Sequence, residues 1–241
     1  MNLLAFETST NYLVIAVTDG KRVLGSLARE VHRELQVYMV GAMQEVLSHA
    51  GLSLQSIDAL AVGLGPGSFT GLRVGITFVK GLSFAMGKPV VGIPSLDLIA
   101  QNASVLNRPI VPILDAKIQQ IYWARYRRSS GELVRESPYT IGPVEALLEE
   151  LEGDVFFLGD AIPIYEKRLR SVQAIRPAFA APKHWLPTPE TLACLGMKEV
   201  LHKRFIPSEK LLPLYLHPKE CTIAGRLAPP KTGKPIRVEI P

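Results

Sequence analysis

The sequence predicts an α/β protein with two related lobes, each built from a mixed β-sheet flanked by helices. Two observations support this prediction. Short apolar runs alternate with stretches of helical periodicity, and the order of elements in the first half of the chain recurs in the second half. We therefore expect an N-terminal lobe over residues 1–103, a C-terminal lobe over 104–218 and an extended tail, rich in Pro and Lys, over 219–241.

Three strands and a helix open the first half. Apolar runs separated by turn residues predict three strands, at 2–8, 12–18 and 22–28. The Asp19-Gly20 pair predicts a hairpin turn between the last two of them. Apolar residues then recur with a helical period from His32 to Ala50, and Gly51 stands where a glycine often ends a helix. This order predicts an antiparallel start followed by a helix.

A strand, a second helix and another strand come next. The apolar run at 59–64 leads into the glycine-rich sequence GPGSFTG at 65–71. A helix then extends to about Met86, and Gly87 provides its C-terminal cap. The residues from Val90 to Ile93 predict the next strand. A strand, helix and strand in this order predict a right-handed crossover in a partly parallel sheet.

The same order begins again at Ile110. Strands are predicted at 110–114 and 120–126, with a turn at 115–117 between them, and a third strand follows Gly131. The remaining predicted elements are helices at 143–151, 161–170 and 188–203 and a strand at 155–158. The recurrence predicts a second lobe that is related to the first in topology, without obvious sequence identity.

Composition argues against several classes of protein. Hydrophobic residues make up 47% of the chain and charged residues 20%, which is typical of a folded globular protein. The two cysteines, Cys194 and Cys221, form no CxxC pair, and the five histidines lack the HxxxH or HExxH spacing of a metal hydrolase. The formal charge of +5 is scattered along the chain, so we interpret it as a solvated surface rather than a nucleic-acid-binding face.

The N-terminal sequence and the hydropathy pattern predict where the protein resides. The start, MNLLAFETST, lacks the basic region and the small-residue cleavage site of a signal peptide. No apolar run is long enough to span a bilayer. We therefore expect a soluble, cytoplasmic protein.

The sequence GPGSFTG is the strongest local candidate for a binding site. Gly65, Gly67 and Gly71 let the backbone turn tightly, while Ser68 and Thr70 lie at the start of the predicted helix. Free N–H groups in the first turn of a helix can bind a phosphate. Alternatively, the loop only makes a tight turn between the strand and the helix. The spacing is neither that of a Walker A loop nor that of a dinucleotide fingerprint, so both interpretations stay open.

Two carboxylates follow the first strand of each half. Glu7, which precedes Thr8 and Ser9, comes after the first strand, and Asp115 comes after the strand that begins at Ile110. Pseudo-symmetry of the lobes would place both carboxylates at the cleft between them, where they could hold hydrated Mg²⁺. The alternative for each is a solvated or turn-capping acid.

The two helices of the first half carry apolar residues around much of their circumference. Such helices must be buried on more than one side, and a second protein is one plausible cover. The other is a further element of the same chain. The residues that we assign to a partner interface are Leu35, Met39, Met43, Arg73, Phe78 and Lys80.

Four segments together resemble the TsaB family across nearly the whole chain. They are LLAFETST, the stretch LAVGLGPGSFTGLRVGITFVKGLSFAMGKPVVGIPSLD, ILDAKIQQIYWARY and the late LLPLYL. The GPGSFTG block is specific to the family. The resemblance implies the two-lobed fold shared by actin, Hsp70 and sugar kinases. It also implies a shortened paralogue of TsaD, the subunit that transfers threonylcarbamoyl to N6 of adenosine 37 in tRNA.

Departures from the catalytic relative imply a supporting role. TsaD binds its metal through a histidine pair on the helix after the strand at 90–93, where this chain reads PSLD at 94–97. The first phosphate loop of the superfamily has an acid followed by glycine, whereas ETS at 7–9 and DAK at 115–117 have no glycine. The resemblance therefore implies no catalytic residue, no metal and no required cofactor, with at most weak binding of ATP or ADP and Mg²⁺.

The resemblance also implies partners. The TsaD catalytic subunit would bind this chain as a heterodimer through the helices of the first lobe, and the TsaE ATPase would join the complex. In isolation, the same surface allows a homodimer. Contact with tRNA would be at most indirect, and no membrane is involved.

Two other functions remain as alternatives. The first is an ATP-dependent phosphotransferase or ATPase that uses the cleft between the lobes, with Glu7 and Asp115 on Mg²⁺ and the loop 65–71 near phosphate. The second is a peptidase with Ser68 as nucleophile, although the surrounding sequence is not GxSxG and no His and acid are assigned to it.

Overall fold

The computed structural model describes residues 1–31, 34–105, 107–129, 131–216 and 235–239. The chain forms two compact units. Unit 1 consists of Met1–Leu98 and Pro187–Leu214, and unit 2 consists of Ile99–Leu186 and Tyr215–Pro241. Because the chain passes from unit 1 to unit 2 and back again, each unit is built from two separate segments.

Unit 1 contains a five-stranded sheet with the order β3-β2-β1-β4-β5. The central strand β1 runs antiparallel to β2, which pairs with β3, and parallel to β4, which pairs with β5. The strands are β1 (Leu3–Glu7), β2 (Tyr12–Thr18), β3 (Val23–Glu30), β4 (Ala59–Gly65) and β5 (Val90–Pro94). The predicted antiparallel start and the partly parallel sheet are both confirmed.

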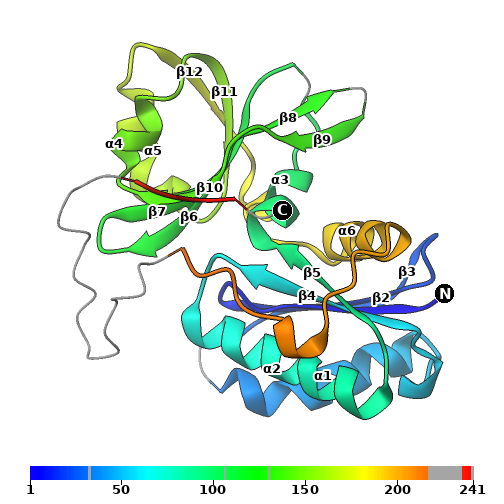
Figure 1. Cartoon of the computed structure of the whole chain (residues 1–241). Helices are drawn as coiled ribbons and strands as arrows, with labels where there is room; N and C mark the ends of the chain where they lie inside the picture. The colour runs from blue at the N-terminus through cyan, green and yellow to red at the C-terminus, as the bar shows by residue number, and fades with distance from the viewer. Residues whose placement is uncertain (32–33, 106, 130, 217–234, 240–241) are drawn as a thin grey trace. The chain divides into compact units, whose positions relative to one another are not determined.

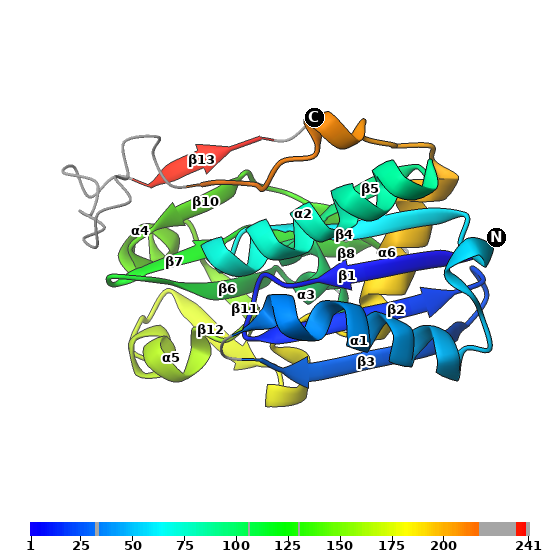
Figure 2. The same ribbon diagram turned by 90° about the horizontal axis from the view of Figure 1, so that it is seen from below.

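Helices cover both faces of the sheet of unit 1. On one face, α1 (Leu35–His49) and α2 (Phe69–Met86) lie side by side, as Figures 1 and 2 show, while α6 (Pro189–Leu201) covers the other. Successive side chains of a strand point to opposite faces, so β1 directs Leu4 and Phe6 to one core and Leu3 and Ala5 to the other. The strands β1, β2 and β4 are therefore buried on both sides, which explains their nearly continuous apolar sequences.

Local signals in the sequence fix the ends of these helices. The Ser68 side chain accepts a hydrogen bond from the Gly71 N–H and caps α2, and Gly87 ends the helix in the left-handed conformation. Thr188 and Thr191 form a reciprocal capping box at the start of α6. Short 3₁₀ turns occur at Leu54–Ser56, Pro182–His184 and Ser208–Lys210, and α3 (Ser95–Gln101) follows β5 directly.

Unit 2 repeats the topology of unit 1. Its sheet has the path β12-β11-β6-β7-β10-β13, in which β6 is antiparallel to β7 and parallel to β11, and the hairpin of β8 and β9 lies off this path. The strands are β6 (Ile110–Lys117), β7 (Gln120–Trp123), β8 (Tyr126–Ser129), β9 (Glu132–Arg135), β10 (Tyr139–Gly142), β11 (Gly153–Leu158), β12 (Ile175–Phe179) and β13 (Ile236–Val238), with helices α4 (Val144–Leu148) and α5 (Ile162–Arg170). The predicted recurrence of the strand order is confirmed.

The division of the chain differs from the predicted one in two places. Helix α6 belongs to unit 1 rather than to the second lobe, because its Leu192, Met197 and Val200 pack on the same core as β1 and β2. The segment predicted as an extended tail contributes the strand β13 to unit 2, while residues 217–234 lie outside the described part of the chain. The boundary near 103 is close to the observed change of unit at Leu98.

The predicted strand at 120–126 is two strands in the structure. β7 ends at Trp123, and β8 begins at Tyr126 and pairs with β6 and β9 instead of β10. The third strand predicted after Gly131 corresponds to β9. Among the described residues, no helix combines the length and hydropathy needed to cross a membrane.

Candidate functional site

The turn between β1 and β2 packs directly on the glycine-rich loop. Thr8 Oγ1 donates a hydrogen bond of 2.9 Å to the Gly71 carbonyl, and the Ser68 N–H donates one of 2.7 Å to the Ser9 carbonyl. A Cβ atom at Gly71 would overlap the Thr8 carbonyl, and one at Gly67 would overlap the Ser9 carbonyl. These glycines are therefore needed for the close approach of two segments of the same chain.

This packing favours the interpretation of GPGSFTG as a tight turn. Thr8 and Ser9 are buried, so they occupy the side of the loop that faces β1, whereas Ser68 and Thr70 are exposed. Gly65 adopts φ +92°, a conformation that favours glycine. Phosphate binding at this loop stays a prediction.

Glu7 is a buried carboxylate held by protein donors. It lies at the end of β1 and is fully enclosed. Ser95 Oγ, at the start of α3, donates a hydrogen bond of 2.7 Å to Glu7 Oε2 and accepts one of 3.1 Å from the Gly65 N–H. The Ser9 N–H donates to Oε1. Glu7 thus connects the first strand, the glycine-rich loop and the start of α3.

The environment of Glu7 changes its ionisation. Burial raises the pKa of the Glu7 carboxyl above its ordinary value of 4.5, and hydrogen bonds from Ser9, Ser95 and Thr8 offset part of this rise. A Cβ atom at Gly63 would overlap Glu7 Oε2, so the neighbouring strand has room for the carboxylate only because residue 63 is glycine. The arrangement gives Glu7 a structural role, and its predicted role as an Mg²⁺ ligand is untested.

Asp115 lies near the end of β6, the strand that has the same central place in the sheet of unit 2 as β1 has in unit 1. Its backbone N–H donates a hydrogen bond of 2.9 Å to Asp160 Oδ1, and Lys117 Nζ lies 2.5 Å from Asp115 Oδ2. This contact raises the pKa of the Lys117 ammonium. The cation beside Asp115 is therefore a lysine of the same turn. The predicted meeting of Asp115 with Glu7 at one cleft stays a prediction.

Part of the predicted partner interface is wrong. Met39 is only 1% exposed and Met43 only 6%, because both belong to the core between α1 and the sheet. Leu35 and Phe78 are partly buried against the same core, and the Phe78 ring packs edge-to-face on Phe6 at 5.4 Å. The apolar stripe that we assigned to a partner is the side of each helix that faces its own sheet.

Other apolar residues of the same helices face outward. Val37 is 67% exposed on α1, and Phe84 is 88% exposed on α2. We call the exposed residues of these two helices the outer helical face. It contains Val37, Tyr38, Val40, Gly41, Phe69, Arg73, Gly81 and Phe84. Of the two charged residues predicted for the interface, Arg73 stacks on Phe69 at 3.8 Å, whereas Lys80 donates a hydrogen bond to the Leu211 carbonyl.

Two glycines of the outer helical face are not explained by packing within the chain. A Cβ atom added at Gly41 or Gly81 would meet nothing within 4 Å. A glycine in the interior of a helix costs about 1 kcal/mol relative to alanine. Small residues on a helix surface allow another backbone to approach closely. No backbone within the described part of this chain approaches Gly41 or Gly81 in this way.

Unit 2 contains a charged region that the sequence did not predict. Two cavities of about 370 and 360 Å³ share Arg125, Glu136 and Glu150 in their walls. Opposite charges around them are already paired, as in Arg127–Glu136 and Arg237–Glu150. Scattered single charges on short strands have no periodicity, so the sequence alone contains no signal for this region. Within the described residues, no three His, Cys, Asp or Glu side chains form a group that could hold a metal ion.

The duplicated strand order, with helices packed on each sheet, defines an α/β protein built from two topologically related units, as predicted. The chain matches the family model of TsaD, tRNA N6-adenosine threonylcarbamoyltransferase, over residues 17–227. It is 30% identical to the tRNA threonylcarbamoyladenosine biosynthesis protein TsaB of Haemophilus influenzae, over 90% of this chain and 93% of that protein. The TsaB protein of Bacillus subtilis is 26% identical, over 83% of this chain and 88% of its own length.

A solved structure gives the same result. YeaZ from Pseudomonas aeruginosa superposes with a TM-score of 0.76 at 29% identity, over 89% of this chain and 99% of that one. The chain therefore belongs to the TsaD-related family and, within it, to the TsaB/YeaZ proteins.

Proposed function

We propose that this chain is a supporting subunit in the biosynthesis of N6-threonylcarbamoyladenosine in tRNA, and that it acts by binding the catalytic TsaD protein. Its relatives are named as biosynthesis proteins for this nucleoside, and the matching family model describes the transferase. The observation that carries the proposal is the outer helical face, where exposed apolar side chains occur on the same two helices as two glycines that no packing within the described chain requires.

The chemistry of this face fits a protein partner. Large apolar side chains at the centre of a surface, with an arginine among them, are typical of interface hot spots. The Arg73 guanidinium stacks on the Phe69 ring, which holds both groups in place before binding and so reduces the entropy lost on association. A partner with the same fold carries helices at the equivalent position, so two pairs of helices would pack against each other.

The same geometry supports a role without catalysis by this chain. Thr8 and Ser9 pack on the glycine-rich loop, protein donors occupy the Glu7 carboxylate, and Lys117 neutralises Asp115. Because these groups already bind one another, the contacts support weak rather than tight binding of a phosphate or Mg²⁺. Binding of ATP or ADP with Mg²⁺ is accordingly expected to be weak and not required. Calorimetric titration with Mg-ATP tests this, because tight binding with turnover would favour an ATPase instead.

The wider assembly is part of the proposal. The TsaE ATPase joins the complex of this chain with TsaD, and tRNA is contacted through the partner. In isolation, the outer helical face of one copy can pair with that of a second copy in an isologous contact, and TsaD would then displace that copy. The cytoplasm is the compartment in which these partners would meet.

Light scattering after size exclusion tests the interface. We expect the chain and TsaD from the same organism to form a one-to-one complex. Val37→Glu or Phe84→Glu should weaken it at least ten-fold, because each places a charge among desolvated apolar groups. Ile164→Glu is the matched control, since Ile164 is an apolar residue 59% exposed on α5 of unit 2.

The two sets of variants give distinct outcomes. If the Val37→Glu and Phe84→Glu proteins bind TsaD as well as the parent does, the interface lies elsewhere. If the parent itself forms no complex, the supporting role is wrong. Melting temperatures of all three variants should stay near that of the parent, because the substituted side chains are exposed.

A further inference from the structure

A three-residue strand from the C-terminal region closes one edge of the sheet of unit 2. β13 pairs antiparallel with β10, with Tyr139 opposite Val238, Thr140 opposite Arg237 and Ile141 opposite Ile236. Residues 217–234 lie between this strand and the preceding part of the chain that the structure describes. The strand is therefore a short segment that reaches the sheet from the end of a long connection.

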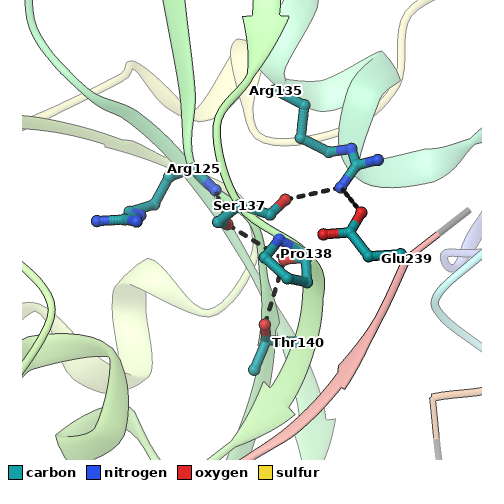
Figure 3. A network of polar contacts seen from close by, with 6 residues as sticks. All are labelled: Arg125, Arg135, Ser137, Pro138, Thr140 and Glu239. Atoms are coloured by element: carbon teal, nitrogen blue, oxygen red, sulfur yellow. Dashed lines mark hydrogen bonds and ion pairs between the residues drawn. The ribbon is translucent and has the colours of Figure 1, made fainter.

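An arginine of β9 is positioned to receive the C-terminal side of this strand. The Arg135 guanidinium lies over the Tyr139 ring at 4.3 Å and donates a hydrogen bond of 2.8 Å to the Ser137 carbonyl. From this position it donates one of 3.1 Å to the Glu239 carboxylate, as Figure 3 shows. Because contacts within unit 2 already fix Arg135, its guanidinium is oriented for a carboxylate before one arrives.

Two further contacts fix the register of the strand. Arg237 donates a hydrogen bond of 2.5 Å to Glu150, which follows α4. A Cβ atom at Gly142 would lie 3.1 Å from Pro235, so the absence of a side chain at Gly142 makes room for the proline. Glu150 thus binds Arg237 of the strand and Arg135 binds Glu239 just after it, while Gly142 leaves room for Pro235, the residue that precedes the strand.

The strand protects β10 but is itself only weakly buried. All four residues of β10 are buried, whereas Ile236 and Val238 are half-buried and Arg237 is exposed. Three ladder positions and two partly exposed ion pairs stabilise a segment only modestly. Segments with few buried contacts open locally while the rest of a protein stays folded. When β13 leaves, the backbone of β10 becomes a free strand edge, which can pair with another extended segment.

We propose that the outer edge of β10 is a docking site for an extended segment with the sequence Pro-Ile-Arg-Val-Glu, and that residues 235–239 are its tethered occupant. The same segment of a second copy fits the site equally well, because every contact named above is made by the segment itself. The tethered segment is favoured at low protein concentration, since its connection to the chain gives it a high effective concentration at the edge.

Fluorescence anisotropy with a labelled peptide of residues 234–241 tests the site. In the full-length variant carrying Ile236→Asp and Val238→Asp, the native occupant is disabled and the edge is vacant. We expect saturable binding of the peptide to this variant, and binding at least ten-fold weaker to the parent, in which the tethered strand competes. A vacated variant that stays folded by circular dichroism and yet binds no peptide would overturn the proposal.

A charge exchange distinguishes specific docking from general adhesion of a peptide. A peptide with Glu239→Arg should bind the vacated variant at least ten-fold more weakly, because Arg135 then faces a like charge. Adding Arg135→Glu to the vacated variant should restore binding of the Glu239→Arg peptide. Equal binding of both peptides to both proteins would show that the ion pair does not recognise the segment, contrary to the proposal.

Hydrogen exchange of the parent chain tests the proposal without any variant. We expect the amides of β13 to exchange at least a hundred-fold faster than those of β6 and β7, yet more slowly than an unstructured peptide. Protection equal to that of β6 would mean that the strand does not detach. Exchange as fast as in an unstructured peptide would mean that it is not bound, and either result contradicts the proposal.

Discussion

The Glu7 side chain is fully buried and yet accepts hydrogen bonds from Ser9 and Ser95, so two opposing effects act on its ionisation. Burial is the larger of the two, and the pKa of the carboxyl rises. The folded chain therefore keeps a proton on Glu7 over a range of pH in which the unfolded chain has lost it. The free energy of unfolding must decrease as the pH rises through that range, which begins near 4.5.

Replacing Glu7 with Gln removes this dependence on pH. The amide keeps an oxygen that can accept the Ser9 hydrogen bond but does not ionise. We expect the free energy of unfolding of Glu7→Gln, relative to the parent, to increase as the pH rises above 4.5, by up to about 1.4 kcal/mol per pH unit. Urea unfolding of both proteins between pH 4.5 and 8 measures this difference in the free energy of unfolding. Glu152→Gln, at an exposed position, is the control, and a difference that shrinks with rising pH would contradict the prediction.

Substitution by alanine should have opposite effects on stability at two glycines of α2. A Cβ atom at Gly75 would overlap Thr8 Oγ1, whereas one at Gly81 would meet nothing within 4 Å. We expect Gly75→Ala to destabilise the chain by about 1–3 kcal/mol through overpacking. Gly81→Ala should instead stabilise it, by up to about 1 kcal/mol through helix propensity. Denaturant unfolding of both variants checks this, and a stabilising Gly75→Ala would show that the turn at Thr8 does not need the space.

At the scale of the element, α1 illustrates what the sequence predicts well and what it does not. The periodicity of apolar residues predicts the helix itself, because a core-facing stripe must repeat with the helical period. It does not distinguish the side facing the sheet from the outer side, since Val37 and Val40 are as apolar as Met39 and Met43. We assigned the wrong side to a partner for this reason.

Neighbouring residues on α1 test this corrected assignment. Met39→Ala should cost about 2–5 kcal/mol, because it leaves a cavity in the core between the helix and the sheet. Val40→Ala should change stability by less than about 0.5 kcal/mol, because Val40 is exposed. Thermal and urea unfolding measure both. Similar losses at the two positions would mean that α1 is buried on both sides in the isolated chain.

Other elements could be predicted where their signals are local in the sequence, and could not where they depend on contacts between distant residues. Strands β1 to β5 and helix α2 were predictable because turns, caps and apolar runs lie next to them in the sequence. The positions of Glu7 and of the glycine-rich loop were also predictable, but their mutual packing depends on residues more than fifty positions apart. β13 has only three residues and therefore no periodicity, so no local signal could have placed it on β10.

At the scale of the whole molecule, the division of unit 1 between two segments governs its stability. Residues 1–98 form the complete sheet, but α6 provides the cover for one of its faces. Leu3, Ala5 and Val14 would be exposed without Leu192 and Met197 of that helix. The predicted boundary near 103 is therefore close to the observed one, but the segment before it is not a complete unit by itself.

A pair of truncated chains tests this dependence. Residues 1–98 alone should show no cooperative unfolding transition, because burial of the sheet on one face only does not offset the entropy of folding. Joining residues 187–214 to this segment through a Gly/Ser linker should restore a cooperative transition in urea. Cooperative unfolding of residues 1–98 without the added segment would show that α6 is dispensable for folding of unit 1.

This discontinuous arrangement also has a consequence for synthesis of the chain on the ribosome. Unit 2 is encoded mainly between the two segments of unit 1, so the N-terminal sheet emerges first and then waits for its cover. At typical elongation rates of about 5–20 residues per second, the wait lasts on the order of ten seconds. During that time the apolar face that will receive α6 is open to chaperones, and the part of the protein that is made first is among the last to finish folding.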